Sequence, residues 1–181
     1  TGVQTCALPI CSLSMGNPNE IAATLSPARE QVAALITRAR AAQAIAARYS
    51  QAQLDDLVAA AGWAIMKPER NRALAEIAVR DTGLGNVEDK INKNHRKTLG
   101  LMRDLKGAIS TGVINDDPAL GITEIARPVG VVCAVVPSTN PGATPANNII
   151  NALKCGNAII LSPSPKGVTT SALLLDYIHA E

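Results

Sequence analysis

Two short polar loops contain the residues of this sequence that are best placed to bind a small molecule. Residues 137–142 (PSTNPG) follow the apolar run Val131–Val136, and residues 162–167 (SPSPKG) follow a second apolar run at residues 158–161. Ligands of open α/β sheets bind beyond the carboxyl ends of the strands, so both loops occupy expected binding positions. They supply hydroxyl, amide and ammonium groups. Neither contains the GxGxxG pattern, and their prolines stiffen the backbone, so an ordinary dinucleotide fingerprint is absent.

The spacing of the cysteines and histidines indicates no metal site. Four cysteines, at positions 6, 11, 133 and 155, form no CxxC pair and have no histidine cluster beside them. This argues against a zinc site or a disulfide scaffold and favours a reducing cytoplasm. Cys133 lies in an apolar run and is expected to be a small buried residue, whereas Cys155 is expected to fill a tight turn. His95 and His179 are expected on helices, in solvated or packing roles.

Composition favours small-molecule chemistry. Seventeen lysines and arginines against 15 acidic residues give a net charge of +2, which is too small to argue for nucleic acid or an anionic membrane. No apolar run approaches the roughly 20 residues that cross a bilayer. The 181 residues are enough for one folded unit with its own core and too few for a large two-domain enzyme.

The elements that must position the two loops begin with a helical region at residues 26–106. Ser26 before Pro27 starts a first helix, and the capping box of Ser50 and Gln53 starts a second, which ends before Pro68. A third helix follows from Pro68, and the GLG sequence at residues 83–85 ends it.

A fourth, polar helix is expected from about residue 86 to residue 105. Its apolar side is predicted to consist of Ile91, Leu99 and Met102. The opposite, solvated face is predicted to carry Lys90, Lys93, Arg96 and Lys97.

After Gly112 the pattern changes to alternating strands and helices. Residues 121–127 alternate like a strand, Val131–Val136 is expected to be a buried parallel strand, and residues 158–161 form another buried run. Helices are predicted at residues 144–153 and 168–178. The fold class is therefore α/β: N-terminal helices followed by the first part of a doubly wound parallel sheet, built on a right-handed βαβ unit.

The two ends of the chain differ from its middle. Residues 1–10 (TGVQTCALPI) resemble the translation of a sequencing adapter and lack the features of a signal peptide. We predict a non-native tail and junction at residues 1–14, a helical region at residues 15–111, and the start of a dinucleotide-binding α/β unit at residues 112–181. The last helix has no C-cap glycine before Glu181, which predicts that this unit is truncated.

Several motifs, in the same order along the chain, resemble the aldehyde dehydrogenase superfamily and, within it, the CoA-acylating branch. The resemblance extends over about residues 26–181. The motifs are TGLG at residues 82–85, VEDK at 87–90 with Lys93 and Asn94, RPVGVV at 127–132, VPSTNP at 136–141, NALKCGN at 151–157, and Ser162, Pro163, Pro165 and Lys166.

This resemblance implies an oxidoreductase that converts an aldehyde and coenzyme A to an acyl-CoA, with hydride transfer to NAD or NADP. In such enzymes a cysteine thiolate adds to the aldehyde, a hydride leaves, and coenzyme A attacks the resulting thioester. The nucleophilic cysteine belongs to a later part of the family fold, so this chain alone is expected to be inactive. The sequences at residues 141–145 and 162–167 resemble those of enzymes that act on sulfoacetaldehyde, with acetaldehyde and succinate semialdehyde as related substrates.

The resemblance also implies site residues. Asn140 matches the family asparagine whose amide donates to the oxyanion of the thiohemiacetal, a contact that supplies about 3 kcal/mol of transition-state stabilisation. From its position alone, an asparagine before proline is also typical of a loop turn. Cofactor-binding residues are expected in both loops: Pro137, Ser138 and Thr139 in the first, and Ser162, Ser164, Pro165 and Lys166 in the second.

The second loop departs from the wider superfamily, which usually has a lysine at the position of Ser162 and a glutamate at that of Pro165. Without that carboxylate, hydroxyls and the Lys166 cation permit NADP as well as NAD. The alternative is that residues 162–165 only end a strand.

Three alternatives to the acylating enzyme stay open: a non-acylating aldehyde dehydrogenase, a non-catalytic flavodoxin-like binding module, and a structural partner that assembles through its helices. A reading frame that continues beyond Glu181 would exclude the structural partner and would show whether a cysteine-bearing domain follows. The family implies assembly through a β-hairpin arm, with residues 121–127 as one strand, so a homo-oligomer is expected for the complete enzyme.

Overall fold

A computed structural model of the protein describes residues 27–181. Its first part consists of four helices, α1 (Pro27–Ala46), α2 (Gln51–Met66), α3 (Pro68–Thr82) and α4 (Val87–Leu105). These are the four helices that the sequence predicts. The expectations for residues 1–14 and for the Ser26 cap lie outside the described residues.

Local chemistry sets the boundaries of these helices. The Ser50 hydroxyl accepts from the backbone N–H of Gln53 at 3.3 Å, and the Gln53 side chain accepts from the Ser50 N–H at 2.9 Å, which completes the capping box predicted for α2. Pro68 is the first residue of α3, where its missing N–H costs no helical hydrogen bond. Gly83, at φ +67°, ends α3 in the left-handed conformation, so the GLG sequence is a helix terminator as predicted.

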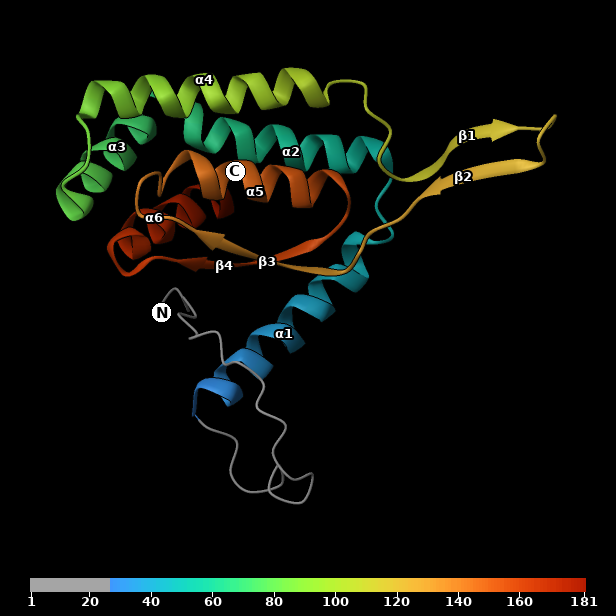
Figure 1. Ribbon diagram of the computed structural model, residues 1–181, viewed down its shortest axis with the longest axis horizontal. Coiled ribbons are helices and arrows are strands. Elements are labelled where there is room, and N and C mark those ends of the chain that lie inside the picture. Colours follow the sequence, from blue (N-terminus) through green and yellow to red (C-terminus); the bar gives the residue numbers. More distant parts are fainter. Residues whose placement is uncertain (1–26) are drawn as a thin grey trace.

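Strands β1 (Gly112–Asp117) and β2 (Ile122–Ala126) form an antiparallel hairpin with a bulge between Val113 and Asn115. At its turn, the Asp117 carboxylate accepts from the backbone N–H groups of residues 119 and 120. The hairpin projects away from the remaining elements (Figure 1).

The remaining chain forms a βαβ unit and one further helix. Its elements are β3 (Val131–Val136), α5 (Ala143–Lys154), β4 (Ala158–Pro163), the short 3-10 turn η1 (Pro165–Gly167) and α6 (Val168–His179). Strands β3 and β4 are parallel, with Val131 opposite Ala158 and Val136 opposite Pro163. The predicted order of strands and helices is confirmed, and so is the α/β fold class.

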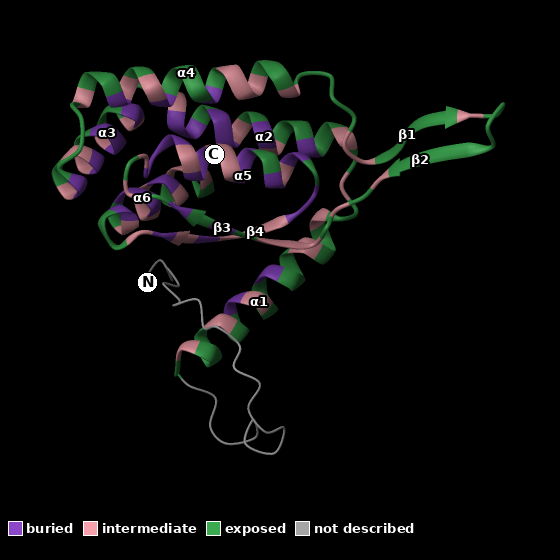
Figure 2. Cartoon of the chain, in the orientation of Figure 1, coloured by how far each residue is buried: buried purple, intermediate pink, exposed green. Residues whose placement is uncertain are grey.

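The elements stack in layers around this strand pair (Figure 1). Helix α1 packs on one side of β3 and β4, and α5 packs on the other; α2 lies on α5 and α6, and α4 lies on α2, α3 and α5. The core forms where α2, α3, α5 and α6 meet the strands, and Figure 2 shows this concentration of buried residues. Its fully or nearly fully buried members include Ile65, Leu74, Val136, Ile150 and Leu174. None of the helices among residues 27–181 is both long and apolar enough to cross a bilayer.

The first wrong prediction about burial concerns β3. Strand β3 is buried on one face only: Ala134 and Val136 are buried, whereas Cys133 is exposed and Val135 is 78% exposed. The apolar run predicts a strand covered on both faces, but among the described residues only α1 packs against the second face, and it leaves the end of β3 uncovered. Cys133 is therefore not the buried residue that the sequence predicts.

The second correction concerns α4. Leu99, predicted on the apolar side, is 50% exposed, and Ile91 and Met102 are only partly buried. The buried residues of α4 are polar: Lys90, Asn94 and Thr98. They lie at i, i+4 and i+8 and share one face, about 100° around the helix from the predicted one.

Candidate functional site

The two polar loops meet at one edge of the strand pair. Because β3 and β4 are parallel and in register, their carboxyl ends lie side by side, at Val136 and Pro163. The backbone N–H of Ser164 donates to the carbonyl of Val136 at 2.9 Å, which joins the starts of the two loops. This is the position that the sequence predicts for a ligand site in an open α/β sheet.

A close contact holds the ends of the two loops together. Pro141 and Gly167 are both buried, and a Cβ atom added at Gly167 would lie 3.0 Å from the Cβ of Pro141 and 3.4 Å from the Oγ of Ser164. Real Cβ atoms are rarely found so near another atom, so the loops approach this closely only with glycine at position 167.

Helix α4 supports the first loop from the side opposite the second. The Lys90 ammonium donates to the carbonyl of Thr139 at 3.4 Å. Asn94 lies against Gly142, where an added Cβ would be 3.1 Å from the Asn94 Oδ1. The Asn94 amide donates to Asn71 of α3 at 2.9 Å, and the Asn71 amide donates to the carbonyl of Ile91 at 3.0 Å. The polar face of α4 therefore positions the loop that carries Asn140.

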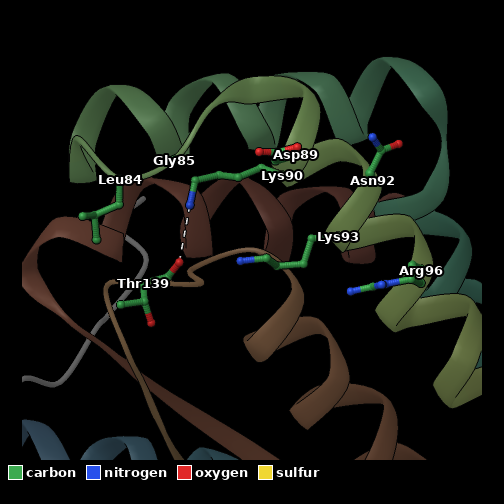
Figure 3. A pocket seen from close by; sticks show the side chains of 8 residues that line it. All are labelled: Leu84, Gly85, Asp89, Lys90, Asn92, Lys93, Arg96 and Thr139. Atoms are coloured by element: carbon green, nitrogen blue, oxygen red, sulfur yellow. Dashed lines mark hydrogen bonds between the residues drawn. The ribbon is translucent and has the colours of Figure 1, made fainter.

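A cavity of about 620 Å³ opens between α4 and this loop (Figure 3). Burial lowers the pKa of Lys90, and the nearby charge of Lys93 lowers it further. Lys90 is only 6% exposed, so the prediction that it belongs to a solvated face is wrong, whereas Arg96 and Lys97 are exposed as predicted. The residues that line the cavity are Leu84, Gly85, Asp89, Lys90, Asn92, Lys93, Arg96 and Thr139.

The structure places all the residues predicted for the site at this edge of the sheet. In the first loop Asn140 and Ser138 are partly buried, and Pro137 and Thr139 are exposed. In the second, Ser162 lies near the end of β4, and Ser164, Pro165 and Lys166 surround the start of η1. The roles assigned to these residues stay predictions.

The described cysteines and histidines lie outside both loops. Cys155 follows α5 in a turn, as predicted, and is exposed; Cys133 lies within β3. His95 and His179 are exposed on α4 and α6, so of the two predicted roles both take the solvated one.

Sequence reasoning missed the supporting residues Asn71, Lys90 and Asn94. A signal for two of them exists, because Lys90, Asn94 and Thr98 repeat at the spacing of one helix face. That signal is easily read as a solvated stripe, since buried polar faces are uncommon. Asn71 has no such signal, because its partners lie on another helix.

Comparison with known proteins identifies the family. A model described as "Aldehyde dehydrogenase family" matches residues 12–180. The chain belongs to the aldehyde dehydrogenase family. This confirms the resemblance that the motifs indicate and removes the flavodoxin-like module from the alternatives.

The relatives include enzymes named as acylating. The chain is 70% identical over 154 residues to a sulfoacetaldehyde dehydrogenase (acylating) from Cupriavidus necator; the match covers 85% of this chain and 31% of that protein. The chain therefore spans about a third of the length of this relative.

Solved structures of aldehyde dehydrogenases resemble the fold of this chain. An acetylating aldehyde dehydrogenase from Geobacillus thermoglucosidasius superposes with a TM-score of 0.77 at 32% identity, over 83% of this chain and 34% of that one. Propionaldehyde dehydrogenase from Rhodopseudomonas palustris, solved with bound CoA and an acylated cysteine, gives a TM-score of 0.67 at 26% identity, over 82% and 34%. Family members with this fold thus include one that holds CoA and an acylated cysteine.

Proposed function

We propose that this chain is part of a CoA-acylating aldehyde dehydrogenase, which converts an aldehyde and coenzyme A to an acyl-CoA while reducing NAD or NADP. The observation that carries the proposal is the 70% identity to an acylating relative over 154 residues. The substrate named for that relative, sulfoacetaldehyde, is the first candidate aldehyde.

In this proposal Asn140 stabilises the reacting carbonyl. Its amide donates to the oxygen that gains negative charge when a thiolate adds to the aldehyde, and the contact matters most in the transition state. Support comes from the loop: Thr139 and Gly142, on either side of Asn140, both contact α4, which limits movement of the amide. Cys133 and Cys155 lie outside the loops, so we propose that the thiolate comes from another part of the enzyme.

The second loop fits the adenosine end of a nicotinamide dinucleotide. The Oγ of Ser164 is buried without a hydrogen-bond partner among residues 27–181, and Lys166 is exposed beside it at the start of η1. Residues 162–167 include no carboxylate that would repel a 2′-phosphate, so the loop accepts NADP as well as NAD. A bound cofactor supplies the hydride acceptor. The Ser164 hydroxyl and the Lys166 ammonium bind and orient its polar groups.

A chimeric enzyme tests the proposal. Residues 27–181 of this chain replace the aligned segment of the Cupriavidus necator relative, and the product is assayed with sulfoacetaldehyde, coenzyme A and either cofactor. We expect reduced cofactor and acyl-CoA in equal amounts, and none from the 181-residue chain alone. Aldehyde oxidation that needs no coenzyme A and yields the free acid would favour the non-acylating alternative instead.

We also propose that the β1–β2 hairpin mediates assembly of the complete enzyme into a homo-oligomer. The hairpin extends away from the core, and its apolar side chains Val113, Ile122 and Ile125 are each at least half exposed. Such an apolar surface on a projecting element is typical of an interface. Polar replacement of Ile122 and Ile125 in the chimera is expected to give smaller particles in light scattering; an unchanged particle size would contradict the proposal.

A further inference from the structure

We propose that the cavity beneath α4 binds the acidic group of an anionic aldehyde, a sulfonate or carboxylate joined to the aldehyde by a short carbon chain. This inference rests on the proposed function and adds to it the residues that select an anionic substrate. Its evidence is the placement of three cations around one cavity beside the loop of Asn140.

Lys90, Lys93 and Arg96 all extend from α4 into the same space (Figure 3). Their spacing of three residues places them on neighbouring turns of one side of the helix. A single carboxylate, that of Asp89, lines the cavity with them, and its Oδ2 accepts from the Asn86 side chain at 2.6 Å at the start of α4. The cavity thus has an excess of two positive charges, counted from three cations and one carboxylate.

The Lys90 ammonium is incompletely satisfied. It is 6% exposed, and its one hydrogen bond within residues 27–181 goes to a backbone carbonyl at 3.4 Å. None of the three cations forms an ion pair with a described residue. Removing an ammonium from water without a counter-charge is costly, and its lowered pKa reflects that cost. An anion between Lys90 and Lys93 would offset it.

The position of the cavity indicates which anion. Thr139 lines the cavity and precedes Asn140, and neighbouring Cα atoms are about 3.8 Å apart. The cavity therefore lies beside the loop of Asn140, and in this proposal an aldehyde whose carbonyl meets the Asn140 amide directs its acid group to the cations. Short aldehydes that end in a sulfonate or carboxylate have this form, and a cavity of about 620 Å³ has room for them.

The anion in the cavity could instead be a phosphate of coenzyme A or of the dinucleotide. Steady-state kinetics of variants of the chimera distinguish these phosphates from the acid group of the aldehyde. Lys93→Gln and Arg96→Gln each remove one charge, and Lys106→Gln removes a charge from the exposed end of α4 as a matched control. Sulfoacetaldehyde and succinate semialdehyde are compared with the uncharged acetaldehyde and butyraldehyde.

We expect each of the two cavity variants to lower the ratio of kcat/KM for charged over uncharged aldehydes by about tenfold or more, mainly through KM, because charge-assisted contacts to the acid group are lost. The ratio in Lys106→Gln should match that of the parent. Equal losses with both kinds of aldehyde would overturn the inference, and so would a raised KM for coenzyme A or the cofactor with no change in the ratio. A chimera that forms acyl-CoA from no aldehyde would instead contradict the proposed function, and the inference with it.

A binding measurement on the 181-residue chain needs no catalysis. Titration with ethanesulfonate, followed by NMR of the lysine and arginine side chains, should shift the signals of Lys93 and Arg96 saturably and leave that of Lys106 unchanged. Shifts that are the same for all three, or that never saturate, would show general ionic screening and contradict the inference.

Discussion

The loops after β3 and β4 end at the same edge of the sheet but are held in different ways. The β3 loop depends on side chains from α4, since Lys90 reaches the carbonyl of Thr139 and Asn94 packs against Gly142. The β4 loop depends on backbone contacts: the N–H of Ser164 donates to Val136 of β3, and that of Gly167 donates to Ser164 at 2.8 Å. The loop with the proposed oxyanion donor is thus held by side chains of α4, whereas the hydrogen bonds that hold the proposed cofactor loop join its own backbone and that of β3.

The largest expected effect is the loss of kcat when the Asn140 side chain of the first loop is removed. Asn140→Ala in the chimera is expected to lower kcat by about 10² to 10³, because the amide acts on charge that develops only in the transition state. Cofactor affinity, measured by fluorescence titration, should change little, since the second loop is proposed to bind the dinucleotide. Asn151→Ala, an exposed asparagine on α5, is the control. Near-normal kcat, or loss of rate and cofactor binding together, would mean that Asn140 only shapes the loop.

The next effect tests the support from α4. Asn94→Ala leaves the side-chain Oδ1 of Asn71 without its donor and opens space beside Gly142, so we expect a loss of about 1–3 kcal/mol in the free energy of unfolding. Denaturant titration measures this, with the exposed His95→Ala as control.

Amide hydrogen exchange in Asn94→Ala tests whether the loops after β3 and β4 have separate supports. Amides of residues 138–142 should lose protection, while those of residues 164–167 should keep it. Equal loss in both loops would show that they are stabilised as one unit.

A smaller effect is expected in the second loop. Pro165→Glu introduces a carboxylate where the superfamily usually has one, and it should lower the preference for NADP over NAD by about tenfold through repulsion of the 2′-phosphate. Pro165→Gln has nearly the same shape without the charge and serves as control. The dissociation constants of NADP and NAD measure this preference in each variant. If Pro165→Glu and Pro165→Gln changed the preference equally, the 2′-phosphate would not lie beside residue 165.

The smallest effect concerns an ion pair distant from both loops. Asp55 of α2 pairs with Lys154 of α5, whose side chain is 4% exposed, and the hydrogen bond from Lys154 is the main cause of the lowered pKa of Asp55. A carboxyl whose pKa is lower in the folded state contributes stability above its unfolded pKa of about 3.9 and loses that contribution as pH falls through the folded pKa.

Thermal melts of the chain should therefore show a decrease in Tm below about pH 4 that is smaller in Asp55→Asn than in the parent or in the neighbouring exposed Asp56→Asn. Amide hydrogen exchange should become faster in both loops as the Asp55–Lys154 ion pair is lost, since α5 connects the first loop to β4. If the exchange of only one loop rose, α5 would not couple the two loops.

Much of this molecule follows from its sequence. The capping box at Ser50, the proline at position 68 and the glycine at position 83 each set a helix boundary by local hydrogen bonding or backbone conformation, so they can be recognised from neighbouring residues alone. The order of strand and helix from residue 121 onward is equally local, although β1 was not predicted, and with the rule for parallel sheets it places both polar loops at one edge. The motifs by themselves also indicate the family.

The burial of individual side chains, and the contacts that hold the first loop, were decided only by the tertiary structure. A run such as Val131–Val136 has the same apolar composition whether one or both faces are covered, so only the packing shows that Val135 is exposed. Likewise, a lysine at position 90 has the same propensity on either side of a helix. It is buried because the backbone of Thr139, 49 residues further along the chain, lies beneath α4. Local interactions act over a few residues and can be inferred from them, whereas the cavity and its charges arise from contacts between segments that only folding brings together.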